Sequence, residues 1–390
     1  MMPKNKVIPV ICTLFLFLIS AITLPTSSTV AETKDVNKTE QVDATIALVL
    51  STGGLGDYGF NDLAMLGLTN ANQTYNLDTD WVEPDTVAEI TTFIEQFATS
   101  TKTYDLIIAI GFSSFAGVNE SATKHPNQQY MLLDAQLNLT NVASTSFLEH
   151  EGSYLVGAMA AMTTKSNTIA FLGGEIVPLI KKFQAGYEQG ARDINPNLEI
   201  LVQYAPDQAN PWEDVTGGKT VGNNFIDQGA DVLYAAAGKT GLGMFDAVVD
   251  ANDAGGDKVY AIGVDADQDG LHPGDILCSM VKRVDTAVER NIKRIVDGLK
   301  PANFLDQGLD TGLIDISNMT YTTSEKDAVW NSTTGQTRYE KVQELKQDII
   351  DGEIVVASTI AATPGFEYAG MVFGLFVIAS MPLFRRKRKH

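Results

Sequence analysis

Cysteine and histidine are scarce in this 390-residue sequence, and their scarcity excludes several kinds of site. There are two cysteines, Cys12 and Cys278, and four scattered histidines. Cys12 falls in an amino-terminal apolar run, so Cys278 has no partner for an internal disulfide in the rest of the chain. A structural zinc site needs four ligands, mostly thiolates and imidazoles, so we expect no zinc cluster, no other metal and no cofactor.

Positive charge is also in short supply. The chain has 28 Lys and Arg residues against 48 Asp and Glu residues, a formal net charge of -20. Many of its cations lie at the ends, at Lys4, Lys6 and in the run 385–389. Nucleic-acid binding needs a cationic surface that neutralises phosphates. An acidic body of this kind excludes nucleic acid as the expected partner.

Long apolar runs occur only near the two ends. Residues 1–25 carry a short basic segment, an apolar stretch and Pro25, which is the layout of a secretory signal peptide. Residues 366–384 are mostly apolar and precede a basic tail, 385–390. As a helix, that segment is long enough to span a hydrocarbon core of about 30 Å. Because basic flanks stay cytoplasmic, we expect a single-pass anchor in the cell membrane with the body outside the cell.

Two polar segments, 26–43 and 357–365, are typical of flexible tethers. Within the second tether and its junction, Thr363-Pro-Gly-Phe366 resembles the Pro-Gly-Phe sorting tails of archaeal surface proteins, which implies a tail that is cut and replaced by lipid. Cys12 follows very few apolar residues, unlike the acylated cysteine of bacterial lipoproteins. We therefore expect anchoring at the carboxyl end and not at the amino end.

The intervening body alternates short β-rich apolar runs with longer amphipathic stretches, which predicts an α/β fold with parallel sheets covered by helices on both faces. Its length exceeds what one small sheet needs, so we expect two lobes with a crossover near Asn141–His150. The predicted strands are Thr45–Leu50, Leu106–Ile110, Tyr130–Leu133, Thr168–Leu172, Val232–Ala235 and Tyr260–Gly263. The predicted helices are Thr86–Ser100, Val177–Ile194, Gly241–Ala254 and Val284–Gly298.

Candidate ligand-binding residues follow the predicted strands, because ligands of doubly wound sheets bind at the carboxyl ends of strands. The glycine-rich loop from Ser51 to Asp62 offers Asp57, Phe60 and Asn61 to a ligand. The alternative is a flexible turn in which Asn61 or Asp62 caps the following helix. Asp134 ends a predicted strand and is open to the same two interpretations. Phe183 has the spacing of either a core residue or a cleft residue.

Two further motifs and the absence of a third exclude other kinds of function. Gly238–Gly243 opens a helix, but a phosphate-binding P-loop needs glycine where Leu233 stands. Asp265–Gly270 has the spacing of a calcium loop, but Ile276 replaces its bidentate glutamate. There is no Gly-x-Ser-x-Gly motif and no histidine in these loops, so we expect no enzyme. A nucleoside hydrolase would have only the acidic residues of 265–269 to use.

Several segments, in order, resemble the basic membrane protein family of ABC-transporter solute receptors, whose best understood members bind purine nucleosides. The resemblance covers about residues 44–356 and implies a type I periplasmic-binding-protein fold. Two Rossmann-like lobes, joined by three crossovers, would clamp a nucleoside without catalysis. The resembling segments are Phe147–Ala158, Phe171–Gly174, Ile180–Tyr187, Ala236–Gly243, Ile262–Gln268 and Ser279–Asp285.

The resemblance also implies lobe boundaries and roles for individual residues. Lobe 1 is expected at about 44–145 and 265–310, and lobe 2 at about 146–264 and 311–356. Lys239 departs from the family's usual glycine pair and is expected at the cleft mouth. The implied contacts are Phe60 and Phe183 on the two faces of the base, Asp57 and Asn61 near its edge, Asp134 at the base or ribose edge, Asp265 and Lys282 at the sugar, and Gly238 through its backbone.

The expected function is therefore extracellular capture of a nucleoside, with a purine base favoured, and delivery to an ABC permease and its ATPase. The alternative is a surface receptor of the same fold that binds a sugar or another small solute for signalling and not for uptake.

Overall fold

The structure is a computed structural model that describes residues 42–360. The predicted signal peptide 1–25, nearly all of the first tether, the predicted membrane helix 366–384 and the basic tail 385–390 lie outside the described residues. Among the helices of residues 42–360, none combines the length and apolar character needed to cross a bilayer.

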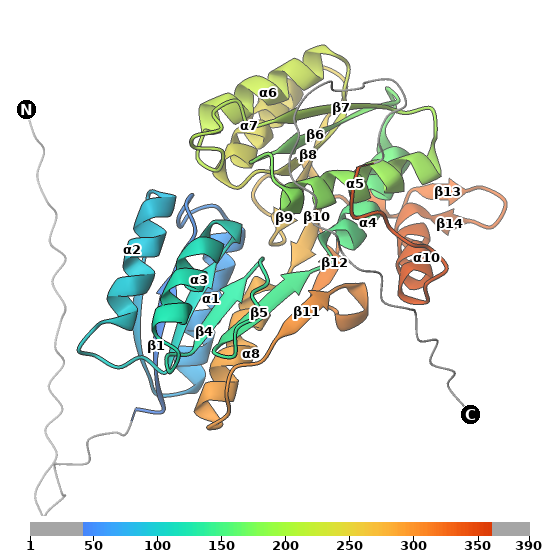
Figure 1. Cartoon of the computed structure of the whole chain (residues 1–390). Coiled ribbons are helices and arrows are strands. Elements are labelled where there is room, and N and C mark those ends of the chain that lie inside the picture. Colours follow the sequence, from blue (N-terminus) through green and yellow to red (C-terminus); the bar gives the residue numbers. More distant parts are fainter. Residues whose placement is uncertain (1–41, 361–390) are drawn as a thin grey trace, which may run out of the picture. The chain divides into compact units, whose positions relative to one another are not determined.

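The first lobe is built on a six-stranded sheet in the order β11-β5-β4-β3-β1-β2 (Figure 1). Every neighbouring pair in it is parallel. Its strands are β1 (Ala44–Val49), β2 (Leu77–Val82), β3 (Leu106–Ile110), β4 (Tyr130–Leu133), β5 (Val142–Phe147) and β11 (Phe304–Gln307).

Helices cover both faces of this sheet, which explains why β1 and β3 are apolar at almost every position. In β1, Ile46 and Leu48 belong to the core cluster that includes residues of α1 and α8, whereas Ala47 and Val49 belong to the cluster that includes residues of α2 and α3. The helices are α1 (Phe60–Thr74), α2 (Val87–Ala98), α3 (Phe115–Lys124, preceded by a 3-10 turn at Phe112–Ser114) and α8 (Val284–Val296).

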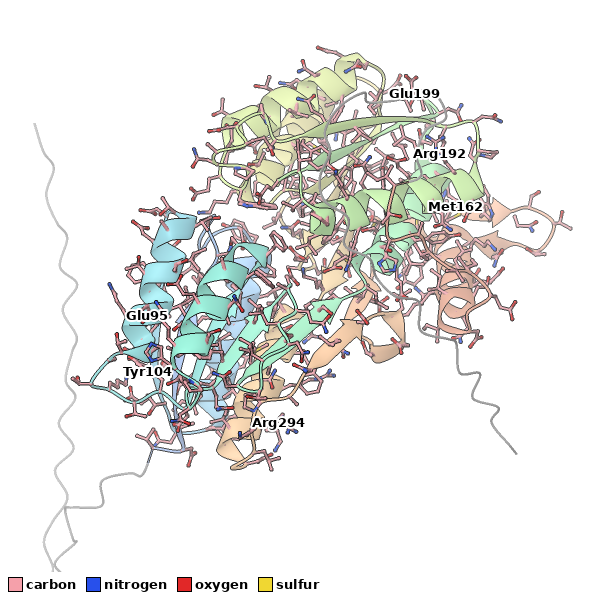
Figure 2. All side chains as sticks on the ribbon, in the orientation of Figure 1. Glu95, Tyr104, Met162, Arg192, Glu199 and Arg294 are labelled. Atoms are coloured by element: carbon pink, nitrogen blue, oxygen red, sulfur yellow. The ribbon has the colours of Figure 1, made fainter. Side chains whose placement is uncertain are left out.

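The second lobe repeats this plan with the sheet order β12-β10-β9-β8-β6-β7. All its pairs are parallel except β10 with β12. Side chains fill the space between sheet and helices, and Glu199 at the start of edge strand β7 projects outward (Figure 2). The strands are β6 (Thr168–Gly173), β7 (Glu199–Tyr204), β8 (Val232–Ala236), β9 (Tyr260–Asp265), β10 (Ile276–Lys282) and β12 (Ile314–Ile316).

Four helices again cover the two faces. Residues of α4 and α5 share one core cluster with Phe171 and Tyr234, and residues of α6 and α7 share the other with Leu172 and Leu233. Helix α10 packs against α4. These helices are α4 (Glu149–Thr163), α5 (Pro178–Ile194), α6 (Val215–Asp227), α7 (Lys239–Asp253) and α10 (Arg338–Ile350), and the small elements are a 3-10 turn at Leu309–Thr311, α9 (Thr323–Lys326), β13 (Val329–Asn331) and β14 (Gln336–Thr337).

The chain passes between the lobes three times, as expected: at Leu148, at Arg283 and along 308–313. Backbone hydrogen bonds join these passages, because the Leu148 N–H donates to the carbonyl of Gln307 and the Arg283 N–H donates to that of Leu313. All six predicted strands and all four predicted helices coincide with observed elements.

The predicted lobe boundary at residue 265 was placed too early. β10 pairs with β9 and extends the second sheet, so residues 266–282 belong to the second lobe and the chain returns to the first lobe at Arg283. The predicted crossover 141–150 likewise contains β5, which is a strand of the first sheet, and only Leu148 lies between the lobes. Which sheet an apolar strand joins depends on long-range pairing, and the strand's own residues do not specify it.

Candidate functional site

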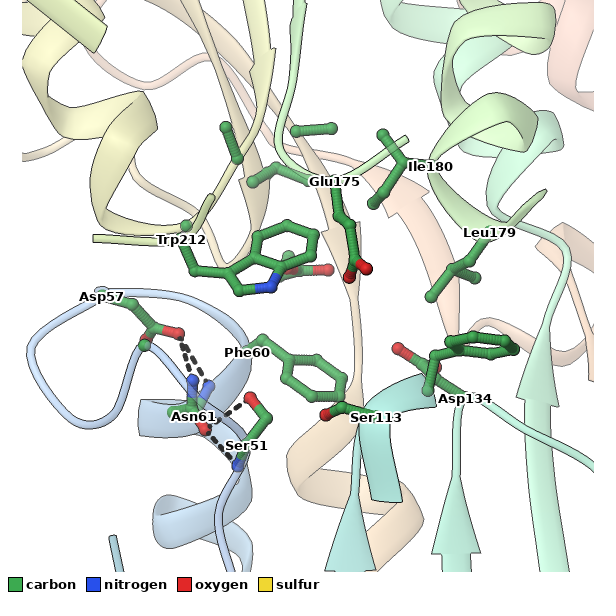
Figure 3. A pocket seen from close by; sticks show the side chains of 18 of the residues that line it. Ser51, Asp57, Phe60, Asn61, Ser113, Asp134, Glu175, Leu179, Ile180 and Trp212 are labelled. Carbon is green, nitrogen blue, oxygen red and sulfur yellow. Dashed lines mark hydrogen bonds between the residues drawn. The ribbon is translucent and has the colours of Figure 1, made fainter. Parts of the chain in front are cut away.

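A cavity lies where the carboxyl ends of strands from the two sheets face each other (Figure 3). Loops after β1, β3, β6 and β8 line it. The strand order reverses between β1 and β3 in the first sheet and between β6 and β8 in the second, and ligands of such folds usually bind at this point. It contains about 730 Å³ of empty space, part of it open to solvent. All eight residues predicted for the site line this cavity: Asp57, Phe60, Asn61, Asp134, Phe183, Gly238, Asp265 and Lys282.

One end of the cavity holds a single buried ammonium among three carboxylates. The Lys282 side chain, at the end of β10, is 2% exposed. Its Nζ lies 2.7 Å from Asp134 Oδ2, 3.7 Å from Asp265 Oδ1 and 3.8 Å from Glu149 Oε1. Burial acts to lower the pKa of Lys282, but the three carboxylates outweigh burial and raise it above its usual value. Lys282 is therefore a permanent cation that joins the two lobes through Asp134.

Asp134 and Asp265 occupy matching positions in the two lobes, directly after β4 and at the end of β9. Both have left-handed backbones, with φ of 65° and 64°. Such conformations cost on the order of 1–3 kcal/mol and gather at functional sites. Their Oδ1 atoms are buried and accept no hydrogen bond from the described residues. Burial raises the pKa of Asp265 to about 6, with Lys282 opposing the shift. The pair offers acceptors for donors that a ligand brings.

Aromatic side chains line the cavity from both lobes. Phe60 begins α1, Phe183 lies on α5, and Trp212 lies in the loop between β7 and α6. Lys282 Nζ lies 4.8 Å from the Phe60 ring centroid and 5.7 Å from that of Phe183. In Figure 3 the Phe60 ring and the Trp212 indole project toward the cavity from opposite lobes. These walls suit a flat, apolar part of a ligand.

Asp57 is committed to the first turn of α1. Its carboxylate accepts the backbone N–H groups of Gly59, Asn61 and Asp62 at 2.9, 2.9 and 3.2 Å, together with the Asn61 side-chain amide at 3.0 Å. Asn61 Oδ1 accepts the Ser51 N–H at 3.0 Å, so one Asn61 amide hydrogen is left for the cavity. Asp57, and not Asn61 or Asp62 as the alternative expected, therefore accepts the N–H groups at the start of α1 and holds Asn61 in place.

Gly238 comes directly before α7, with a φ of 54° that favours glycine. A Cβ at this position would lie 3.3 Å from the carbonyl oxygen of Trp212, so the backbone there approaches closely. The neighbouring Lys239 was expected at the cleft mouth. Lys239 does not line the cavity, and its Nζ lies 3.5 Å from Glu213 Oε1.

The acidic loop after β9 does not gather its carboxylates at one point. Asp269 is buried and accepts hydrogen bonds from Ser279 Oγ and Ser317 Oγ, each at 2.7 Å, within the second lobe. Asp267 is exposed, whereas Asp265 faces the inner cavity. The loop therefore anchors β9 to its neighbours.

Sequence reasoning missed several cavity residues, among them Trp212 and Glu175. Trp212 lies in a loop without a motif, and its position depends on two glycines. A Cβ on Gly174 would lie 2.3 Å from the indole, and one on Gly53 of the other lobe would lie 3.0 Å from Trp212 Cβ. Glu175 directly follows the Gly-Gly pair that ends β6, and that pair was the available signal for it.

Comparison with known proteins identifies the family of this chain. The family model described as "ABC transporter substrate-binding protein PnrA-like" matches residues 44–359. The "CD4+ T-cell-stimulating antigen" of Listeria monocytogenes is 32% identical over 80% of this chain and 88% of its own length. The "ABC transporter nucleoside-binding protein BmpA" of Lactococcus lactis is 30% identical over 82% and 90%. An "uncharacterized lipoprotein" of Pyrococcus abyssi is 34% identical over 70% and 68%.

A solved structure shows the same architecture. An ABC transporter solute-binding protein from Aeropyrum pernix superposes with a TM-score of 0.73 and is 29% identical over 81% of this chain and 93% of that one. The family match spans both lobes and every residue of the cavity. Solute binding is not a class of enzyme, and it implies a small-molecule ligand with a permease and an ATPase as partners. This chain belongs to the PnrA-like family of ABC transporter substrate-binding proteins.

Proposed function

We propose that this protein captures a nucleoside, with a purine base favoured, between its two lobes and delivers it to the permease. The observation that carries the proposal is the pair of buried, unsatisfied oxygens, Asp134 Oδ1 and Asp265 Oδ1, at the end of an otherwise aromatic cavity. A ligand that fits must supply hydroxyl donors at one end and a flat apolar body at the other.

The polar end suits the two neighbouring hydroxyls of ribose. A buried acceptor without a donor costs about 1–3 kcal/mol, so a ligand that supplies donors to Asp134 and Asp265 removes that penalty. Lys282 uses one of its three N–H donors on Asp134, which leaves donors for the hydroxyl oxygens. A diol both donates and accepts, and the cluster offers partners for both.

The aromatic part suits the base. Stacking of a base on an aromatic ring contributes about 1–3 kcal/mol in nucleic-acid binders. Phe60 belongs to the first lobe and Phe183 to the second, so a base between them would contact both lobes at once. A free sugar would leave much of this aromatic surface without a partner. The relative from Lactococcus lactis whose name states nucleoside binding supports the same choice.

The charge of the polar end argues for an uncharged ligand. Three carboxyl groups, Asp134, Asp265 and Glu149, surround the ammonium of Lys282, and a second cation, Lys182, has its Nζ 3.5 Å from Glu149 Oε2. Burial raises the pKa of Glu149 to about 7, which reduces its negative charge at neutral pH. A phosphate about 4 Å from a carboxylate costs about 4 kcal/mol per pair of unit charges at an effective dielectric of 20. Nucleotides should therefore bind more weakly than nucleosides.

Contacts between the lobes explain how binding would be signalled. Besides the Lys282–Asp134 pair, Gln268 Nε2 donates to the Tyr58 carbonyl at 3.0 Å. A ligand that contacts both lobes adds to these contacts and shifts the equilibrium toward the closed state, which a permease can distinguish from the open one.

The proposed location is the outer face of the cell membrane, with residues 366–384 as the anchor. Among the relatives, the Pyrococcus protein carries the name lipoprotein, which supports membrane attachment of the family. Protease added to intact cells should digest the body of the full chain. The same treatment should not digest a chain expressed without residues 1–25, because that chain would stay inside the cell. Protection of the full chain in intact cells would contradict this topology.

Calorimetry on the purified protein tests the ligand. We expect binding of adenosine, guanosine and inosine, with each monophosphate at least about tenfold weaker and with free ribose much weaker than any nucleoside. Ribose as tight as the nucleosides would favour the sugar-receptor alternative. Tighter binding of the monophosphates would contradict the charge argument, and no heat from any nucleoside would reject the proposal.

A further inference from the structure

Glu175 places a carboxylate in the part of the cavity away from Lys282. It follows β6, lines the inner cavity, and extends toward the space beside Phe60 and Trp212 in Figure 3. Within residues 42–360, its carboxylate forms no hydrogen bond and no ion pair. Burial raises the pKa of Glu175 above its usual value. An acceptor without a protein partner at this position is available to a ligand.

The sheet sets the separation between Glu175 and the sugar end. Strand β8 lies between β6 and β9. Asp265 ends β9, and Glu175 comes two residues after the end of β6. Neighbouring strands are about 4.8 Å apart, so these ends are about 10 Å apart. That separation matches the reach of a nucleoside from its ribose hydroxyls to the far edge of its base. A ligand whose ribose meets Asp265 therefore presents its base edge to Glu175.

We propose that Glu175 is a specificity-determining residue that selects guanosine among the purine nucleosides. The inference rests on the proposed function, because it requires a nucleoside in the cavity. A carboxylate only accepts hydrogen bonds. Guanine presents two adjacent donors, N1–H and the 2-amino group, and one carboxylate can accept both.

The other purines match Glu175 less well. Hypoxanthine, the base of inosine, presents N1–H without the amino group. Adenine presents an unprotonated N1, whose lone pair would face a carboxylate oxygen and repel it, and its 6-amino donor lies on the other side of N1 from guanine's 2-amino group. The expected order of affinity is therefore guanosine, then inosine, then adenosine.

Calorimetry with these three nucleosides, on the wild-type protein and two variants, tests the inference. Glu175→Gln keeps the size of the side chain, removes its charge and adds an N–H donor that suits adenine N1. Because hydrogen bonds to charged groups are the stronger ones, the guanosine preference over adenosine should fall by about tenfold or more. The matched control is Glu213→Gln, which changes the net charge equally at an exposed position. Glu213 does not line the cavity described above but a second hollow that adjoins it.

The outcomes separate the two proposals. A wild-type preference for guanosine that Glu175→Gln reduces and Glu213→Gln preserves supports the inference. Nucleoside binding with no guanosine preference, or with a preference that Glu175→Gln leaves unchanged, overturns the inference and leaves nucleoside capture intact. A wild-type protein that binds none of the three overturns both.

Discussion

Replacing Asp265 by asparagine should stabilise the ligand-free protein while it impairs ligand binding. Burial raises the pKa of Asp265 from 3.8 to about 6. Keeping this carboxylate ionised at pH 7 therefore costs the folded state on the order of 3 kcal/mol relative to the unfolded chain. Asparagine has the same shape, cannot ionise, and tolerates the left-handed backbone at this position. Lys282 keeps Asp134 and Glu149 as partners.

The sign of the pH dependence follows from the protons bound. Between about pH 4 and pH 6 the folded protein holds a proton on Asp265 that the unfolded chain has lost. The contribution of Asp265 to stability therefore falls as pH rises through this window. The advantage of Asp265→Asn should be largest at pH 7 and should shrink toward pH 4.

Thermal unfolding of the wild-type protein and the variant, at pH 7 and near pH 4, measures both effects. We expect a higher midpoint for Asp265→Asn at pH 7, a smaller difference near pH 4, and nucleoside affinity reduced by about tenfold or more through the lost charged hydrogen bond. Asp257→Asn is the control, because it makes the same charge change at an exposed position of the second lobe.

Two results would refute this reasoning. A lower midpoint for Asp265→Asn at pH 7 would mean that attraction to Lys282 outweighs the cost of burying the carboxylate. A difference that does not vary with pH would mean that Asp265 does not titrate in this window.

Three further substitutions test separate parts of the site. Phe60→Ala should weaken nucleoside binding by roughly 5- to 150-fold through lost stacking, and an unchanged calorimetric affinity would remove the ring from the site. Gly174→Ala places a Cβ 2.3 Å from the Trp212 indole; the indole must move, so tryptophan fluorescence should change and affinity should fall, whereas an unchanged spectrum would contradict the packing. Asp57→Ala removes the acceptor of four hydrogen bonds that hold Asn61 and the first turn of α1. It should lower unfolding free energy by about 1–3 kcal/mol, and a denaturation midpoint equal to that of the wild type would contradict the capping role.

Local pattern was sufficient for the strands in the middle of each sheet. It missed the edge strands and also β5 and β10, which lie next to the edges. β3 is apolar at every position because helices cover both its faces, and such a run is visible in the sequence. Edge strand β2, Leu-Asp-Thr-Asp-Trp-Val, has three consecutive polar residues and one buried residue, so no apolar run marked it. Edge strand β7, Glu-Ile-Leu-Val-Gln-Tyr, was also missed; it contains a short apolar run, but none of its residues is fully buried.

Some residues of the candidate site could be predicted from local sequence, and others could not. Asp134 and the Asp57–Asn61 loop could be proposed because each directly follows an apolar strand, and parallel strands bring their carboxyl ends to one edge. Trp212 and Glu175 could not be assigned, because each reaches the cavity through packing against residues distant in sequence.

By itself, the sequence determined the alternation of strands and helices, the acidic character of the body and the polar residues at strand ends, since all of these are local or compositional. Only the tertiary structure decided that Lys282 of one lobe meets Asp134 of the other across 148 residues, with Nζ and Oδ2 2.7 Å apart. It also decided that β10 joins the second sheet. The physical reason is that strand order and the approach of the lobes depend on the pairing and packing of distant segments, which no local pattern of residues encodes.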